Sequence, residues 1–328
     1  MNPAGGVNPE AVRTFLEAPR PVALLQLWQA WLHSPECNDL RLMPGLQSEG
    51  EWRNDPIQAR QAMLDFLATV PPETWWSLSA FVHAIQQHHP GFQRPANDFD
   101  SWYLRDVESG AYLRGIEHWD AVDGALLRYL ISGPLRHLGL VQVALPAQGE
   151  EPTAFRWSSW AGALLRGTPP QGLPAEEERL HATSSGRVFA PPGVPRAVRY
   201  QIARFCTWEG TKAAAYAYRI TPQSLERARA QGLEPRHLLQ LLARHARQVP
   251  PTLQRAIQQW GQHGTQARLQ HAVILRLRSP EVMDKVRKSK AARFLGEPLG
   301  PTSVLVRQGA EEKVLEILAE LGYLGEVV

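Results

Sequence analysis

Cysteine and long apolar runs are both scarce in this chain. Its 328 residues include only two cysteines, Cys37 and Cys206. They lie too far apart to indicate a disulfide framework or a cysteine-based zinc site, so we expect two buried, inert thiols. No run approaches the roughly 18 to 20 consecutive apolar residues that span a bilayer. Residues 1–10 lack the basic segment and apolar run of a secretory signal, and we expect a cytoplasmic protein with no membrane contact.

The motifs of common catalytic sites are missing as well. A helicase motor needs a loop of the form GxxxxGK followed by Ser or Thr, because backbone amides hold the phosphates and the lysine reaches the outer ones. The nearest string, EGTKAA at residues 209–214, lacks the first glycine and is interpreted as a turn between two strands. No HExxH pair or GxSxG elbow occurs. We therefore expect no enzyme, no cofactor and no small-molecule substrate.

Two polar clusters leave metal chemistry as an alternative. His83, His88 and His89 form the densest histidine group, but a spacing of five puts the first two on different faces of a helix, so we expect surface or capping histidines. Asp98 and Asp100 are able to bind a divalent ion. Such acidic stretches more often form turns and pair with arginines, here Arg94, Arg105 and Arg114. We expect no metal, and a metal-dependent nuclease stays the weakest alternative.

Helical periodicity and turn residues divide the chain into two parts. Residues 1–145 are mainly helical, with a strong helix start at Asp55 and Pro56, and the short helices followed by an extended hairpin suggest a winged-helix type of module. Residues 146–186 are rich in Pro, Gly and Glu and are interpreted as a linker. Residues 187–328 alternate strand and helix patterns. The fold class expected is α+β.

Charge is distributed unevenly along the chain, although the net charge is only +3. Residues 1–195 hold 14 basic and 21 acidic residues, residues 196–293 hold 19 and 5, and residues 294–328 hold 2 and 6. Nearly all the cations are arginines, whose planar fork binds phosphate oxygens bidentately. A block of this charge either binds an anionic partner or is neutralised within the protein.

Several surfaces of the basic block are candidates for contact with the DNA backbone. On one helix Arg236, Arg244 and Arg247 are expected to form a stripe. On a strand Arg276 and Arg278 are expected on the face opposite Leu269, Val273, Leu275 and Leu277. A further helical segment supplies the remaining cations, which are Lys285, Arg287, Lys288 and Lys290. An acidic protein partner, pairing with the acidic first half, and solvated faces are the alternatives. Five tryptophans offer base-stacking surfaces but are expected to pack mostly in the core, namely Trp75, Trp76, Trp102, Trp119 and Trp208.

The basic block also resembles a known family. The spacing TP-x-SL-x-RA-x-x-x-GL at residues 221–233 and the segment LG-x-x-LGPT at residues 295–302 resemble the N-terminal domain of XPB-type (Ssl-type) DNA helicases and of bacterial helicase-associated proteins that carry it. Upstream segments such as FQRPANDFDSWYLRD resemble the region that precedes this domain in bacterial members. The resemblance covers most of residues 30–328, and the helicase motor is absent from this chain.

The resemblance implies a part of the DNA repair and transcription machinery that does not hydrolyse ATP. In XPB relatives the domain mainly docks a partner subunit, so protein binding is implied at least as strongly as DNA binding. We therefore predict a winged-helix-like half (residues 1–145), a linker (146–186) and a basic, mixed α/β domain like the XPB N-terminal domain (187–328). The predicted function is a non-catalytic helicase-associated module that contacts the DNA backbone, docks a helicase or repair protein, or does both; a pure protein-interaction scaffold is the alternative.

Overall fold

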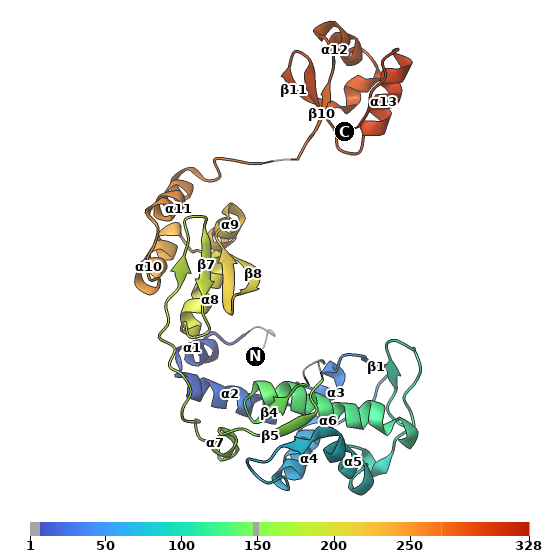
Figure 1. Cartoon of the computed structure of the whole chain (residues 1–328), viewed down its shortest axis with the longest axis vertical. Helices are drawn as coiled ribbons and strands as arrows, with labels where there is room; N and C mark the ends of the chain where they lie inside the picture. The colour runs from blue at the N-terminus through green and yellow to red at the C-terminus, as the bar shows by residue number, and fades with distance from the viewer. Residues whose placement is uncertain (1–6, 147–150, 270, 328) are drawn as a thin grey trace. The chain divides into compact units, whose positions relative to one another are not determined.

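A computed structural model describes residues 7–146, 151–269 and 271–327, which are shown in Figure 1. Internal contacts divide the chain into two compact units, Met1–Gln258 (unit 1) and Gln259–Val328 (unit 2). Helices and small antiparallel sheets occur in both, which confirms the mixed α+β class. The domain division predicted from the sequence stays a prediction, and a strand and a helix, Ala154–Trp157 and Ala161–Leu165, lie within its linker.

Unit 1 begins with helices whose starts follow local sequence signals. Asn8 caps the first helix, and the Asp55 side chain accepts hydrogen bonds from the backbone of Ile57 and Gln58, as the sequence predicts. The first helix ends at Glu17 and the second begins at Arg20, with Ala18 and Pro19 between them. Pro21 therefore lies in the first turn of the second helix. The helices of this part are α1 (Pro9–Glu17), α2 (Arg20–His33), α3 (Asp39–Leu42), α4 (Pro56–Ala68), α5 (Leu78–His88), α6 (Ala125–Leu130) and α7 (Ala161–Leu165).

A three-stranded antiparallel sheet accompanies these helices. Its strand order is β2 (Trp76–Ser77), β5 (Ala154–Trp157), β4 (Val141–Ala144), so the last two strands form a hairpin after the helices. A two-stranded sheet of β1 (Leu46–Ser48) and β3 (Leu104–Asp106) belongs to the same part. Helices followed by a hairpin are what the sequence predicts, and the winged-helix assignment itself stays a prediction.

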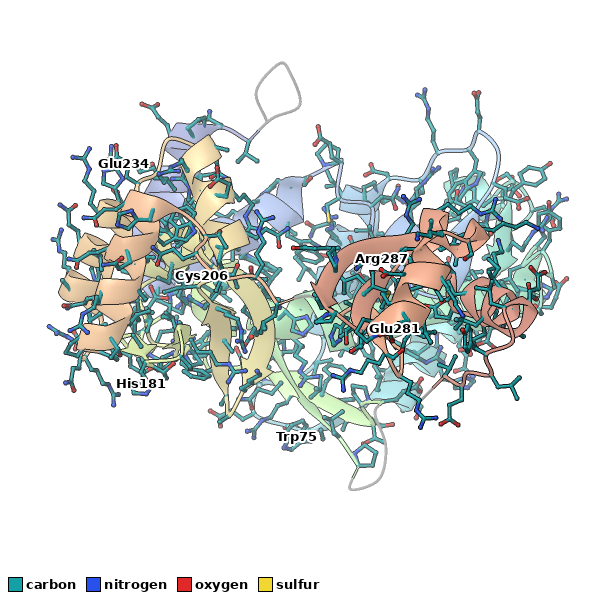
Figure 2. The ribbon with its side chains drawn as sticks, turned by 90° about the horizontal axis from the view of Figure 1, so that it is seen from above. Trp75, His181, Cys206, Glu234, Glu281 and Arg287 are labelled. Atoms are coloured by element: carbon teal, nitrogen blue, oxygen red, sulfur yellow. The ribbon has the colours of Figure 1, made fainter. Side chains whose placement is uncertain are left out.

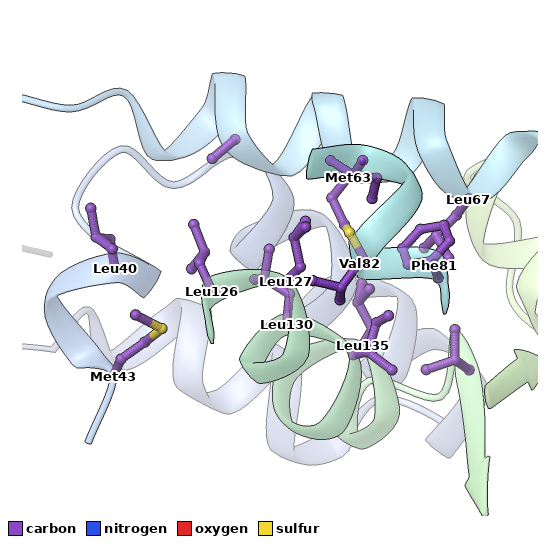
Figure 3. Packing of buried hydrophobic residues seen from close by; sticks show 14 of the residues in the cluster. Leu40, Met43, Met63, Leu67, Phe81, Val82, Leu126, Leu127, Leu130 and Leu135 are labelled. Atoms are coloured by element: carbon purple, nitrogen blue, oxygen red, sulfur yellow. The ribbon is translucent and has the colours of Figure 1, made fainter. Parts of the chain in front are cut away.

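The core of this part is built from apolar faces of α2, α4, α5 and α6 (Figure 3). Leu67, Leu127 and Leu130 are fully buried in it, and two ion pairs lie among the apolar side chains. Arg60 Nε is 2.7 Å from Asp39 Oδ2, and Arg94 NH2 is 2.8 Å from Asp123 Oδ2.

The rest of unit 1 combines a four-stranded antiparallel sheet with helices. The strand order is β6 (His181–Ala182), β7 (Arg187–Ala190), β9 (Ala215–Arg219), β8 (Thr207–Lys212). Of the string EGTKAA, residues 209–212 belong to β8 and only Ala213 and Ala214 form the turn to β9, so the predicted turn is shorter than the string. Thr221 and Ser224 form a capping box at the start of one helix, and Gly232, with φ of +76°, follows its end. The helices are α8 (Arg196–Phe205), α9 (Pro222–Ala230), α10 (Pro235–His245) and α11 (Pro251–His263), the last of which crosses into unit 2.

Unit 2 is a small sheet with helices on one face. Its order is β10 (Val273–Arg276), β12 (Ser303–Val306), β11 (Leu295–Gly300), with neighbouring strands antiparallel. The helices α12 (Pro280–Arg287) and α13 (Glu311–Glu320) bury Val286, Val314 and Leu318 in a common core with β12. A 3-10 turn, Lys290–Phe294, leads into β11.

Candidate nucleic-acid interface

The strand β10 separates apolar and basic side chains as the sequence predicts. Val273, Leu275 and Leu277 pack against the core of unit 2, whereas Arg276 and Arg278 are exposed. Because alternate residues of a strand point to opposite faces, Arg276 lies on the face of the sheet that the helices leave open. Leu269 was expected to share the apolar face, but it lies outside β10 and its side chain is fully exposed.

The helix α12 carries the next group of predicted cations. Pro280 occupies its first turn, and Met283 and Val286 bury its inner face. Lys288 is exposed at the C-cap. At 3.6 residues per turn, Lys285 and Arg287 lie about 160° apart around the helix axis, so they flank the outer face instead of sharing it. Arg287 and Glu281 are labelled in Figure 2.

Acidic groups interrupt this surface on α12. Glu281 and Asp284 are exposed on the same helix. The Ser279 hydroxyl, and secondly the backbone N–H of Glu281, lower the pKa of the Glu281 carboxyl below its ordinary value, so this charge persists at neutral pH. The exposed surface of α12 therefore carries both charges, and Glu281 and Asp284 lie between Lys285 and Arg287 around the helix.

Within the described part of the chain, the predicted cations of unit 2 nevertheless form no ion pair. Among the described residues, none of the six, Arg276, Arg278, Lys285, Arg287, Lys288 and Lys290, lies within 4.0 Å of a carboxylate oxygen. Lys285 Nζ contacts the Tyr323 hydroxyl at 3.3 Å, which does not neutralise its charge. Residues 268–293 carry eight basic and two acidic side chains, and residues 294–328 two and six, so charge is segregated along this unit.

The three predicted cations of unit 1 do not form one helical stripe. Arg236 and Arg244 lie on α10, but this helix ends at His245, and Arg247 follows it, where its backbone N–H donates to the carbonyl of Leu180. Arg236 Nε lies 2.7 Å from Glu234 Oε2 in an exposed ion pair. Arg244 and Arg247 are exposed and have no carboxylate partner in the described part of the chain.

Other arginines of the basic block are neutralised inside unit 1. The Glu209 carboxylate contacts Arg219, Arg187 and Lys212, and these three hydrogen bonds, with that of Arg219 the strongest, lower the pKa of Glu209 to about 2. Arg219 and Lys212 of the basic block thus share the Glu209 carboxylate within the β7–β9–β8 sheet. Among the predicted cations in the described residues, Arg244 and Arg247 of unit 1 and all six of unit 2 remain without a carboxylate oxygen within 4.0 Å.

The metal alternatives find no support in the geometry. The described residues contain no group of three or more His, Cys, Asp or Glu side chains that could hold a metal ion. Asp98 Oδ1 accepts hydrogen bonds from the backbone of Asp100 and Ser101, chiefly the former, which lowers the pKa of Asp98 and forms the predicted turn. Arg94 and Arg105, however, form ion pairs with Asp123 and Glu49 instead of with this acidic stretch.

Cysteines and tryptophans only partly follow the sequence prediction. Cys206 is buried and its pKa is raised to about 12 by desolvation, whereas Cys37 is only half-buried. Among the five tryptophans, Trp102 and Trp119 are in the core, but the side chains of three are 37–52% exposed, namely Trp75, Trp76 and Trp208. Aromatic surface is therefore available on unit 1, where only a minority of these rings was expected to be free.

Comparison with known proteins relates one segment of the chain to helicases. A family model described as "Helicase conserved C-terminal domain" matches residues 180–297. The DNA 3'-5' helicase XPB of Kineococcus radiotolerans (strain ATCC BAA-149 / DSM 14245 / SRS30216) is 29% identical over 136 residues, which are 40% of this chain and 24% of that helicase. The chain thus spans about a quarter of the length of this relative. A helicase-related similarity is supported, and the specific likeness to the XPB N-terminal domain stays a prediction. None of the described helices is both long and apolar enough to cross a membrane.

Proposed function

We propose that this chain is a non-catalytic, helicase-associated module that contacts the DNA backbone through the cations of unit 2. The observation that carries the proposal is the set of six exposed cations between Arg276 and Lys290 that no carboxylate of the described chain neutralises. Exposed arginines and lysines bind phosphates by charge and by charge-assisted hydrogen bonds. The similarity of residues 180–297 to helicase-related proteins supports a role beside DNA.

The non-catalytic part of the proposal is supported by the missing phosphate-loop motif and by the lack, among the described residues, of a His, Cys, Asp and Glu group that could hold a metal ion. Docking of a helicase or repair protein is the second component. It is favoured by the mixed surface of α12, where Glu281 and Asp284 lie between the cations, because alternating charges select a complementary protein surface. We place the protein in the cytoplasm, in DNA repair or transcription; a pure interaction scaffold is the alternative.

A salt titration of DNA binding by the full chain tests the proposal. Each neutralised phosphate contributes about −0.9 to the slope of log K against log salt, so six contacts give a slope of about −5 and a loss of roughly three decades between 50 and 200 mM salt. The triple variant K285E/R287E/K288E is expected to reduce the magnitude of this slope by about 3. It is also expected to weaken binding to duplexes of different sequence to the same extent.

A matched pair of single variants controls for overall charge. Lys288→Glu and Lys313→Glu change the net charge equally, but Lys313 lies on the acidic helix α13. Only Lys288→Glu is expected to weaken binding. Equal effects of the two variants, or no DNA binding by the full chain at 50 mM salt, would overturn the proposed contact and leave the scaffold, to be tested by co-purification with a helicase.

A further inference from the structure

Unit 1 contains a second cationic site that no single stretch of sequence indicates. A hollow of about 320 Å³ lies where α1, α2, α8 and the chain after α6 meet. Four arginines line it, Arg20, Arg136, Arg196 and Arg199, with His137 beside them, and the only carboxylate among its lining residues is that of Glu176. Arg20 and Arg136 come from residues 1–195, which carry seven more acidic than basic side chains, whereas Arg196 and Arg199 begin the basic block.

The arginines on α8 are held in place by contacts that leave donors unused. Arg196 donates to the backbone carbonyls of Phe15 and Ala18, and the Glu176 carboxylate bridges Arg196 and Arg199 at 3.3 and 3.4 Å. One carboxylate shared by two guanidinium groups leaves a net positive charge. The Nε atoms of both arginines are buried without a hydrogen-bond partner, and a buried donor of this kind calls for an acceptor that completes the site.

The two remaining arginines have no counter-charge of their own. Arg20 is half-buried in the first turn of α2 and Arg136 is exposed, and neither lies within 4.0 Å of a carboxylate oxygen in the described part of the chain. Like charges that converge on a hollow repel one another unless an anion binds there. The hollow is therefore suited to a ligand with concentrated negative charge, such as a phosphate group.

Aromatic rings form the walls beside these cations. Trp160 and Tyr216 line the hollow, and the Arg199 guanidinium lies 5.3 Å from the centre of the Tyr216 ring. Gly139 brings bare backbone against Trp160: its φ is +76°, and a Cβ atom there would be 2.9 Å from the indole ring. A side chain at this position would move the ring, so the glycine fixes one wall.

A second hollow, of about 430 Å³, has lining residues in common with the first. The two share Arg136, Gly139 and Trp160, and the second is also lined by Trp75, whose side chain is 44% exposed. The Arg156 guanidinium lies 4.6 Å from the centre of the Trp75 ring. Figure 2 labels Trp75, which immediately precedes β2. Cations alternating with accessible aromatic rings are the pattern with which proteins hold the phosphates and stack the bases of single strands.

We infer that this hollow binds the phosphate of a nucleotide unit, either free or within a single strand, with its base against the aromatic wall. Arg20, Arg136, Arg196 and Arg199 supply the charge and the guanidinium donors. The inference goes beyond the proposed function, because it concerns unit 1 and shares no residue with the cations of unit 2.

Fluorescence anisotropy with two probes tests the site on the full chain. The probes are a labelled twelve-residue oligothymidylate and a fluorescent ATP analogue. The variant R20E/R136E is expected to lose at least tenfold in affinity for the oligonucleotide, and the control R53E/R166E, which reverses two exposed arginines elsewhere in unit 1, to stay within twofold of the unaltered protein. A parallel loss with the ATP analogue assigns the free nucleotide as a ligand; a loss with the oligonucleotide alone assigns the single strand.

Two further measurements separate this site from the rest of the protein. All titrations are repeated in the K285E/R287E/K288E background, in which the proposed DNA contact of unit 2 is removed. The loss of affinity caused by R20E/R136E is expected to be the same in this background, whether or not unit 2 binds DNA. Because Arg20 lies in a helix start, Arg136→Glu and the charge-preserving Arg136→Lys are measured alone, and only the former is expected to weaken binding. Unchanged affinity of R20E/R136E for both probes, or no binding of either probe by the unaltered protein, overturns the inference.

Discussion

Removing the Asp123 carboxylate is the most demanding test of the energetics of unit 1. Asp123 is completely buried and accepts three hydrogen bonds, from Gln93 Nε2 at 2.7 Å and from Arg94 Nε and NH2 at 3.1 and 2.8 Å. The Arg94 guanidinium also lies 4.0 Å from the centre of the Trp102 ring. Asp123→Ala removes every acceptor of this group and leaves a guanidinium whose side chain is only 3% exposed.

The expected cost follows from that residual charge. Removing one partner of a buried ion pair costs about 3–5 kcal/mol, because the remaining charge is desolvated without compensation. For a unit of this size, 1 kcal/mol lowers the unfolding midpoint by roughly 2–4 °C, so Asp123→Ala is expected to lower it by about 6–20 °C. Replacing both partners in Arg94→Met/Asp123→Leu removes the charge together with its partner and is expected to recover more than half of this loss.

Thermal unfolding followed by tryptophan fluorescence measures the effect, since ten of the eleven tryptophans lie in residues 1–258. Asp120→Ala is the matched control: Asp120 lies three residues away and pairs with Arg128 at 2.6 Å, but the Asp120 side chain is 64% exposed and that of Arg128 38%. Such a pair contributes about 0–1 kcal/mol. A midpoint for Asp123→Ala within 2 °C of that for Asp120→Ala would refute the reasoning from burial.

Two further predictions concern the hairpin of β8 and β9. Its arginine contacts lower the pKa of Glu209 to about 2 from an ordinary 4.5, so the stabilisation is complete above pH 4.5 and is lost as the pH falls toward 2. Glu209→Gln is expected to destabilise the protein at pH 7 and to make its free energy of unfolding less dependent on pH between 4.5 and 2, as measured by urea unfolding. A variant with the same pH dependence as the unaltered protein would exclude this linkage. Ala213 and Ala214 have φ of +46° and +61°, and this left-handed conformation costs an L-residue about 1–2 kcal/mol each. Asn and Gly favour such a turn, so A213N/A214G is expected to raise the unfolding midpoint by a few degrees in calorimetry. A lower midpoint would contradict the left-handed turn.

Local features of this fold could be predicted from sequence because their causes are local. The caps at Asp55 and Thr221 depend on a side chain and the backbone two or three residues away, and the alternation in β10 depends only on the period of a strand. Arg247 shows the limit of this reasoning. Its angular position suits α10, but the helix ends two residues earlier, where the chain pairs with Leu180, a contact that periodicity does not encode.

Contacts between distant residues account for the rest. Proximity in sequence favoured Arg94 as a partner of Asp98 and Asp100, whereas the structure pairs it with the buried Asp123, 29 residues away. The hollow likewise joins distant segments, because Arg20 lies more than a hundred residues before both Arg136 and Arg196. The basic block was visible in the sequence, but which of its members are neutralised depended on where Glu209 and Glu176 lie.

The two outer strands of the unit 2 sheet differ in a way that bears on self-association. β11 has register shifts and contains Pro298, which has no amide hydrogen to offer, while β10 is regular. A regular outer strand is a template on which a second copy can extend the sheet. Exposed charged side chains on an outer strand oppose such pairing, and Arg276 is exposed at the end of β10. The guanidinium group that we propose for phosphate contact is thus also a charge that opposes growth of the sheet.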